Sequence, residues 1–177
     1  MKELTDDIFY KYIEKYDKCL LDYVILSADE DYKGEVSHKE AVITAVSALN
    51  SRKRVGNMIN PPEFYVDESK MRCEKCDTEN FFIISPKRMV YHDWTYSDVF
   101  LNSDCMPYSV PYTAEDFRKV NHLLFPACYR KDLEIYSWND GFSNYFDYGN
   151  DCLGAIMWSI YDRHMMRFVI IGSSITD

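Results

Sequence analysis

The chain has 177 residues, 47% of them hydrophobic and 16% aromatic, and its formal net charge is −9. This is enough apolar material for one domain with a hydrophobic core, which we expect to span residues 1–177. The negative charge argues against general nucleic-acid binding, which needs a basic face to neutralise phosphates, and favours basic partners. The first residues lack the features of a signal peptide, and no apolar run approaches the roughly 20 residues of a membrane span. We therefore expect a cytoplasmic protein with no membrane partner.

The charge is uneven along the chain. Residues 1–50 carry −5, residues 51–131 carry +1 and residues 132–177 carry −5. The nearly neutral middle holds 12 of the 20 basic residues. One fold could therefore present an acidic face to a basic partner and also keep a local basic patch, which leaves direct nucleic-acid contact open as an alternative.

The first part of the chain predicts helices. Apolar side chains recur at spacings of three and four over residues 5–26, which is the pattern of one face of a long helix. After a polar loop at residues 29–36, Ser37 and Glu40 fit a capping box that begins a second helix. We expect residues 5–55 to form a helical N-terminal part.

The remaining part, residues 63–177, is richer in predicted strands. Short apolar runs between turn residues predict strands at 64–66, 81–84 and 89–92. A third helix is expected over residues 114–124, where Thr113 and Asp116 can form a capping box.

The C-terminal third gives the clearest pattern. Leu133–Trp138 alternates between apolar and polar residues, and the β-rich runs 154–161 and 167–173 predict an antiparallel hairpin. Helices first and strands last indicate an α+β fold. We expect an antiparallel sheet with this hairpin at its centre and about three helices packed on one face.

Cys73 and Cys76 have the spacing of half a zinc site. A closed structural zinc site needs four ligands, and no second pair of this kind occurs in the sequence. The simpler interpretation is a pair of reduced thiols at a hairpin, without a cofactor. Zinc binding and a redox function remain alternatives.

Histidines and arginines could supply the chemistry of a metal-independent ribonuclease. Such an enzyme needs two converging proton-transfer groups and a cation for the phosphate. The candidate residues are His92, His164, Arg163 and Arg130. Nothing in their spacing shows that they converge, so surface and capping roles are the simpler interpretation.

Residues 139–151 form a long segment that is both acidic and aromatic. Rigid aromatic side chains flanked by charge are typical of interface anchors, so this loop and the acidic N-terminal helix are the predicted recognition surfaces. Its oxygen ligands lack the spacing of an EF-hand calcium loop. The candidate binding residues are Trp138, Asp140, Phe142, Tyr145, Asp147, Tyr148 and Asp151.

The end of the chain resembles small proteins carried by phages and plasmids of Gram-positive bacteria. The similar segments are Trp158–Asp162, Arg167–Asp177 and, before them, Asn144–Asp147. Some proteins of that genomic setting are anti-CRISPR proteins that disable a Cas9-type nuclease. The resemblance covers roughly the last 40 residues and implies no particular site.

Three functions are consistent with the sequence. The leading hypothesis is an acidic, mobile-element-encoded protein that inhibits a nucleic-acid-handling defence enzyme such as a Cas9-type nuclease, by occupying its basic channel. The second is a small ribonuclease acting on structured or guide RNA. The third is an immunity or adaptor protein that binds a toxin or another host protein.

Overall fold

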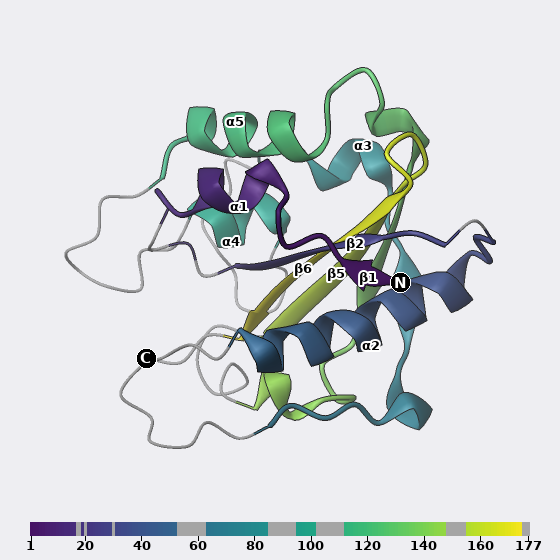
Figure 1. Ribbon diagram of the computed structural model, residues 1–177. Helices are drawn as coiled ribbons and strands as arrows, with labels where there is room; N and C mark the ends of the chain where they lie inside the picture. Colours follow the sequence, from purple (N-terminus) through teal and green to yellow (C-terminus); the bar gives the residue numbers. More distant parts are fainter. Residues whose placement is uncertain are drawn as a thin grey trace.

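Six strands form one antiparallel sheet in the order β1-β2-β6-β5-β4-β3 (Figure 1). This computed structural model describes residues 1–16, 19, 21–29, 31–52, 63–84, 95–101, 112–147 and 155–174. The strands are β1 (Lys2–Glu3), β2 (Asp22–Ser27), β3 (Cys73–Lys75), β4 (Leu133–Trp138), β5 (Ala155–Asp162) and β6 (Arg167–Ser174). The hairpin β5-β6 lies at the centre of the sheet, and the α+β class with this central hairpin is confirmed.

Five α-helices, and not about three, pack on this sheet within the described residues. They are α1 (Ile8–Ile13), α2 (Glu35–Ser51), α3 (Thr78–Phe81), α4 (Tyr96–Leu101) and α5 (Ala114–Leu124). Short 3-10 helices occur at Glu68–Lys70 (η1), Arg130–Asp132 (η2) and Asn144–Phe146 (η3). The helices cover both faces, with α2 on one side and α1, α4 and α5 on the other (Figure 1).

The prediction of helices on one face is wrong because the central strands are apolar on both faces. In β5, Trp158 and Ile160 lie in the core beneath α5, whereas Met157 and Tyr161 lie in the core beneath α2. Strand β6 alternates in the same way. A sheet with two apolar faces must be covered on both.

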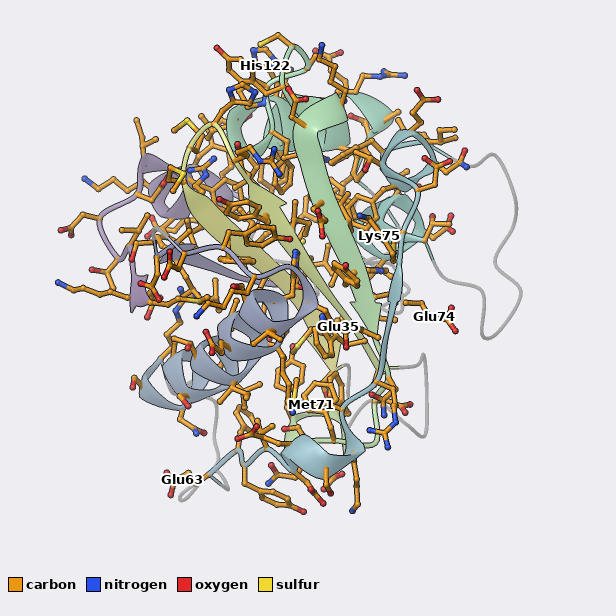
Figure 2. All side chains as sticks on the ribbon, turned by 90° about the vertical axis from the view of Figure 1, so that its right-hand side faces the viewer. Glu35, Glu63, Met71, Glu74, Lys75 and His122 are labelled. Carbon is orange, nitrogen blue, oxygen red and sulfur yellow. The ribbon has the colours of Figure 1, made fainter. Side chains whose placement is uncertain are left out.

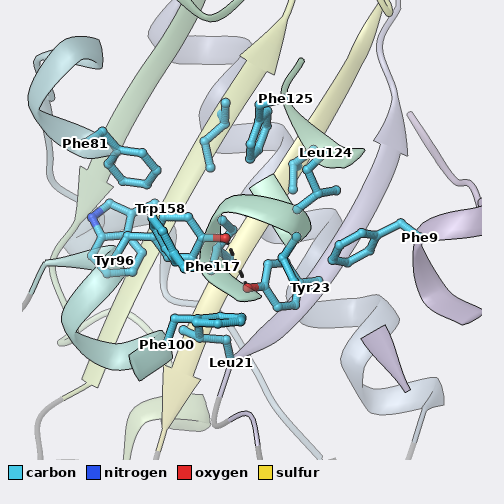
Figure 3. Close-up of a cluster of buried hydrophobic side chains, with 14 of the residues drawn as sticks. Phe9, Leu21, Tyr23, Phe81, Tyr96, Phe100, Phe117, Leu124, Phe125 and Trp158 are labelled. Carbon is cyan, nitrogen blue, oxygen red and sulfur yellow. Dashed lines mark hydrogen bonds between the residues drawn. The ribbon is translucent and has the colours of Figure 1, made fainter. Parts of the chain in front are cut away.

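The core on the α5 side is built largely of aromatic rings (Figure 3). Tyr96 of α4 lies at its centre, stacked on Phe81 and in contact with Phe117 and Trp158. Its hydroxyl lies 3.1 Å from the hydroxyl of Tyr23 in β2, so the two buried phenols satisfy each other. This pair joins α4 to the sheet.

The long helix predicted for residues 5–26 is wrong. Helix α1 begins after Asp7, whose carboxylate accepts the Phe9 amide, and it ends at Ile13. Strand β2 then begins at Asp22, and four consecutive residues in it are buried. Continuous burial is typical of a strand covered on both faces, and over so short a run it mimics helical spacing.

The predicted starts of the other two helices are correct for α5 and displaced for α2. Helix α5 has the expected capping box, in which Thr113 and Asp116 bond each other's backbone amides. Helix α2 begins at Glu35 and not at Ser37, whose hydroxyl instead accepts the backbone amide of Lys33.

The predicted strand at 81–84 is wrong: Phe81 is the last residue of helix α3, which Asp77 caps, and residues 82–84 follow this helix without joining the sheet. In the run 64–66 only Val66 makes a β-bridge, to Ser143. The run 89–92 lies outside the described residues. No helix in the described ranges is both long and apolar enough to cross a bilayer.

Gly172 in β6 provides a stability test of the core on the α2 side. A Cβ at this position would lie 2.9 Å from the Tyr145 hydroxyl and 3.2 Å from the Met157 methyl group. Tyr145 is buried and donates to Asp22 at 2.9 Å, so its ring has little freedom to move. We expect Gly172→Ala to lower the free energy of unfolding by about 1–3 kcal/mol in urea denaturation.

Gly141→Ala is the matched control for this substitution. Its added Cβ would have only the Asn139 amide nitrogen nearby, at an ordinary 3.6 Å. The control should change stability by less than about 0.5 kcal/mol. Equal effects of the two substitutions would contradict close packing at Gly172.

Candidate functional site: an acidic sheet edge and a basic groove

The aromatic residues predicted as interface anchors lie in the core. Trp138, Phe142 and Tyr145 are each at most 5% exposed and belong to the apolar cluster beneath α2. They do not form the exposed recognition surface that the sequence predicted, because composition alone does not show which way a ring points. Asp140 and Asp147 are exposed. Tyr148 and Asp151 lie outside the described residues.

Cys73 and Cys76 do not form a zinc half-site. Cys73 is the first residue of the extended strand β3 and Cys76 directly follows that strand, and residues three apart along an extended chain are separated by about 10 Å. Cys73 packs against the core beneath α2, and Cys76 packs against the core beneath α5, so they lie on opposite faces. Burial raises the pKa of Cys73 to about 11, which disfavours the thiolate. In the parts of the chain described here, no three His, Cys, Asp or Glu side chains form a metal-binding group.

The proposed ribonuclease residues have separate contacts. His164 lies in the β5-β6 turn, where its Nε2 is 2.9 Å from Asp132 and its ring stacks on Tyr129. Arg130 donates to the Phe125 carbonyl at 3.0 Å and lies over the Phe82 ring.

Of the other two ribonuclease candidates, Arg163 is exposed in the same turn as His164, and His92 lies outside the described residues. Within the described part of the chain, the candidates therefore supply one histidine and two arginines.

A fully buried histidine of α2 is the centre of a polar network. His38 of α2 has Nδ1 2.7 Å from the Ser159 hydroxyl and Nε2 3.0 Å from the Tyr32 hydroxyl. Trp138 donates its indole N–H to Ser159 at 2.8 Å. Tyr32 in turn bonds the carboxylate of Glu134.

The donors and acceptors fix the direction of this chain of hydrogen bonds. A carboxylate only accepts, so Tyr32 donates its single proton to Glu134 and accepts from His38 Nε2–H. In the neutral ring Nδ1 then accepts the Ser159 hydroxyl proton, and the Ser159 oxygen accepts from the indole N–H of Trp138. His38 is therefore the Nε2–H tautomer. Every member is satisfied while His38 is neutral.

Burial lowers the pKa of His38 to about 4, even though the charge of Glu134 opposes this shift. Ser159 is fully buried, so its contact with His38 is structural and does not present a nucleophile to substrate. The network instead couples the interior to the surface, because Glu134 is partly exposed and lies 3.6 Å from the ammonium group of Lys75 on β3.

The sheet ends at an edge rich in carboxylates, which we call the acidic edge. It comprises residues 63–79 and 134–140 together with Glu35 and Lys39 of α2, which contact Cys73 and Glu68. It holds nine acidic and four basic residues, a formal charge of −5. Figure 2 faces this edge, with Glu35, Glu74 and Lys75 labelled on it and His122 near the upper end of the molecule.

Most of the cations on the acidic edge are already paired there. Lys39 lies 3.3 Å from Glu68, Lys70 lies 3.4 Å from Asp67, and Lys75 lies 3.6 Å from Glu134. The fourth, Arg72, donates to the carbonyls of Ser69 and Met71. The excess negative charge is therefore not neutralised within the edge itself.

The acidic edge also carries backbone groups and an aromatic ring that face solvent. Arg72 and Cys76 bond β4 through their backbone groups, so the alternate residues Cys73 and Lys75 direct theirs outward, where no described strand pairs with them. Tyr65 is 64% exposed. The sequence did offer a signal for Tyr65, an aromatic residue close to the acidic pair Asp67-Glu68.

At the other end of the molecule, a groove of about 800 Å³, which we call the basic groove, lies beside α5. Its charged lining consists of Arg118, Lys119, His122, Arg130 and a single acid, Glu115. The rest of the lining is formed by Tyr12, Leu123 and Pro126. Glu115 is 2.7 Å from Lys119, one turn away on α5. The basic groove therefore keeps a net positive charge in an acidic protein.

Comparison of the chain with known protein families and with curated proteins finds no match.

The buried state of His38 predicts a pH dependence of stability. Its pKa is about 4 in the folded protein against 6.5 as the ordinary value. The folded state therefore binds this proton less readily than the unfolded state. The stabilisation is complete above pH 6.5 and is lost as the pH falls toward 4. We expect a loss of up to about 3 kcal/mol from this group.

Urea denaturation at several pH values between about 7 and 4 measures this loss. His38→Asn should be less stable near neutral pH and should lose stability less steeply than the wild type on acidification. His122→Gln, at an exposed position of α5, should keep the wild-type slope. An unchanged slope in His38→Asn would assign the pH dependence to other groups.

Proposed function

We propose that this protein is a binding protein that inhibits a nucleic-acid-handling defence enzyme, such as a Cas9-type nuclease, by docking its acidic edge on a basic surface of that enzyme. The proposal places the protein in the cytoplasm, where such an enzyme meets its nucleic acid. The observation that carries the proposal is the charge of −5 gathered on the acidic edge.

The negative charge of the acidic edge can attract a positively charged partner surface. A Cas9-type nuclease holds its heteroduplex in a positively charged channel. Opposite fields speed docking between proteins, and a carboxylate surface competes with phosphates for the same cations. Since three of the four cations on the acidic edge are paired locally, the remaining carboxylates are available to an external partner.

Tyr65 replaces the buried rings as the aromatic contact of this interface. Its ring is exposed on the acidic edge, and its backbone amide is held by Asn144 at 2.8 Å. Tyrosine is enriched among the residues that contribute most to binding energy. An aromatic anchor surrounded by carboxylates preserves the combination that the sequence predicted for residues 139–151.

The resemblance to mobile-element proteins supports the class of partner and not the position of the site. Two of the similar segments, Trp158–Asp162 and the start of Arg167–Asp177, form the central strands β5 and β6. Their side chains fill the two cores, so this likeness concerns packing.

No contact in the described residues favours the ribonuclease alternative, because His164 and Arg130 are bonded to different partners. The immunity or adaptor alternative would use the same acidic edge with a different basic partner.

Charge reversal on the acidic edge tests the proposal. The double variant Glu63→Lys/Glu74→Lys should bind a guide-RNA-loaded Cas9-type nuclease about tenfold more weakly than the wild type, because it sets like charges against each other. Tyr65→Ala should weaken binding without changing its salt dependence. Biolayer interferometry at about 50 and 300 mM NaCl measures both effects, and wild-type affinity should fall as salt rises.

The comparison variant is Asp6→Lys/Glu14→Lys, which makes the same change in charge beside α1, the other recognition surface predicted from the sequence and one to which this proposal assigns no docking. It should retain most of the wild-type affinity. Undetectable wild-type binding at low salt would exclude a Cas9-type target. Equal losses in both double variants would show that only net charge matters.

A further inference from the structure

The basic groove concentrates cations within a protein whose net charge is −9. Arg118 and His122 are one turn apart on α5, so they share a face of the helix. Lys119 and Arg130 complete the positive lining. The groove is thus a local region of positive charge in a molecule that is negatively charged on average, and it can attract an anionic ligand.

One of these cations is held in place before any ligand arrives. Arg130 donates Nε–H to the Phe125 carbonyl at 3.0 Å, and its guanidinium lies 4.6 Å from the centre of the Phe82 ring. These two contacts fix the plane of the guanidinium and leave its terminal N–H groups for a ligand. A pre-positioned arginine loses little conformational freedom when it binds a phosphate.

The rest of the groove lining is uncharged and can make aromatic and apolar contacts with a ligand. Tyr12, Leu123 and Pro126 give the groove an aromatic and aliphatic part. Lys15 lies 3.5 Å from the centre of the Tyr12 ring, which adds a further cation beside α1. A groove lined by cations and an aromatic ring has the features that proteins use to bind single strands, through phosphates and stacked bases.

We propose that the basic groove binds the phosphodiester backbone of single-stranded nucleic acid. Arg118, Lys119 and Arg130 contact successive phosphates, and Tyr12 contacts a base. The chemistry is common to RNA and DNA. This inference stands independently of the acidic edge, because the two surfaces share no residue.

Fluorescence anisotropy with labelled RNA and DNA strands of about 12 nucleotides and identical sequence tests the inference. Three phosphate contacts predict that the logarithm of the binding constant falls with the logarithm of salt concentration with a slope of about −2. In Arg118→Ala/Lys119→Ala the slope should fall to about −1, with affinity about tenfold weaker near 100 mM salt. Tighter binding of the RNA strand than of the DNA strand would identify RNA as the ligand.

The control is Lys2→Ala/Lys33→Ala, which removes two exposed lysines outside the basic groove. It should bind both strands like the wild type. Both substituted pairs of side chains are exposed, and thermal unfolding confirms that each protein is folded. Absence of wild-type binding at about 50 mM salt, or equal weakening by the groove and control variants, would overturn the proposal.

Discussion

The two apolar faces of the central hairpin are the constraint on which the rest of the fold depends. Neither face of β5 and β6 can be left in water, so α2 must cover one and α1, α4 and α5 the other. Most large apolar side chains are used in these two layers, including the rings of residues 142–146. The surfaces left for recognition are therefore the rims of the layers, where charge and not apolar area distinguishes one region from another.

The polar network beneath α2 connects this interior to one of those rims. Burial keeps His38 neutral, and the chain of hydrogen bonds that starts at its ring ends at Glu134 on the acidic edge. The bond from Tyr32 and the charge of Lys75 outweigh burial and lower the pKa of Glu134. A carboxylate of the proposed interface is thus held ionised and oriented by contacts that begin in the core, which reduces the side-chain freedom lost on binding.

Patterns that depend on neighbours in the chain predicted the structure well, and patterns that depend on neighbours in space did not. The β5-β6 hairpin and the capped helix α5 follow from local alternation and from the Thr113 box. The helix predicted for residues 5–26 is wrong because the buried residues of β2 are consecutive, so their spacing does not distinguish a strand from a helix. The spacing of Cys73 and Cys76 could not show that the strand between them is extended. The acidic edge and the basic groove are each formed by segments that are distant in the sequence. The uneven charge along the chain predicted that an acidic face and a basic patch could exist, but not which residues form them.

The position of β2 has a consequence for the order in which this protein can assemble. Val24 pairs with Ile170, so one of the first strands to leave the ribosome has its central partner among the last. Until then β1 is its one neighbouring strand among the described residues, and the layers of helices that cover it are incomplete. Contacts so distant in sequence slow folding, and an unpaired apolar strand is a site for aggregation. Truncation near the C-terminus would leave β2 with β1, a strand of only two residues, as its remaining partner.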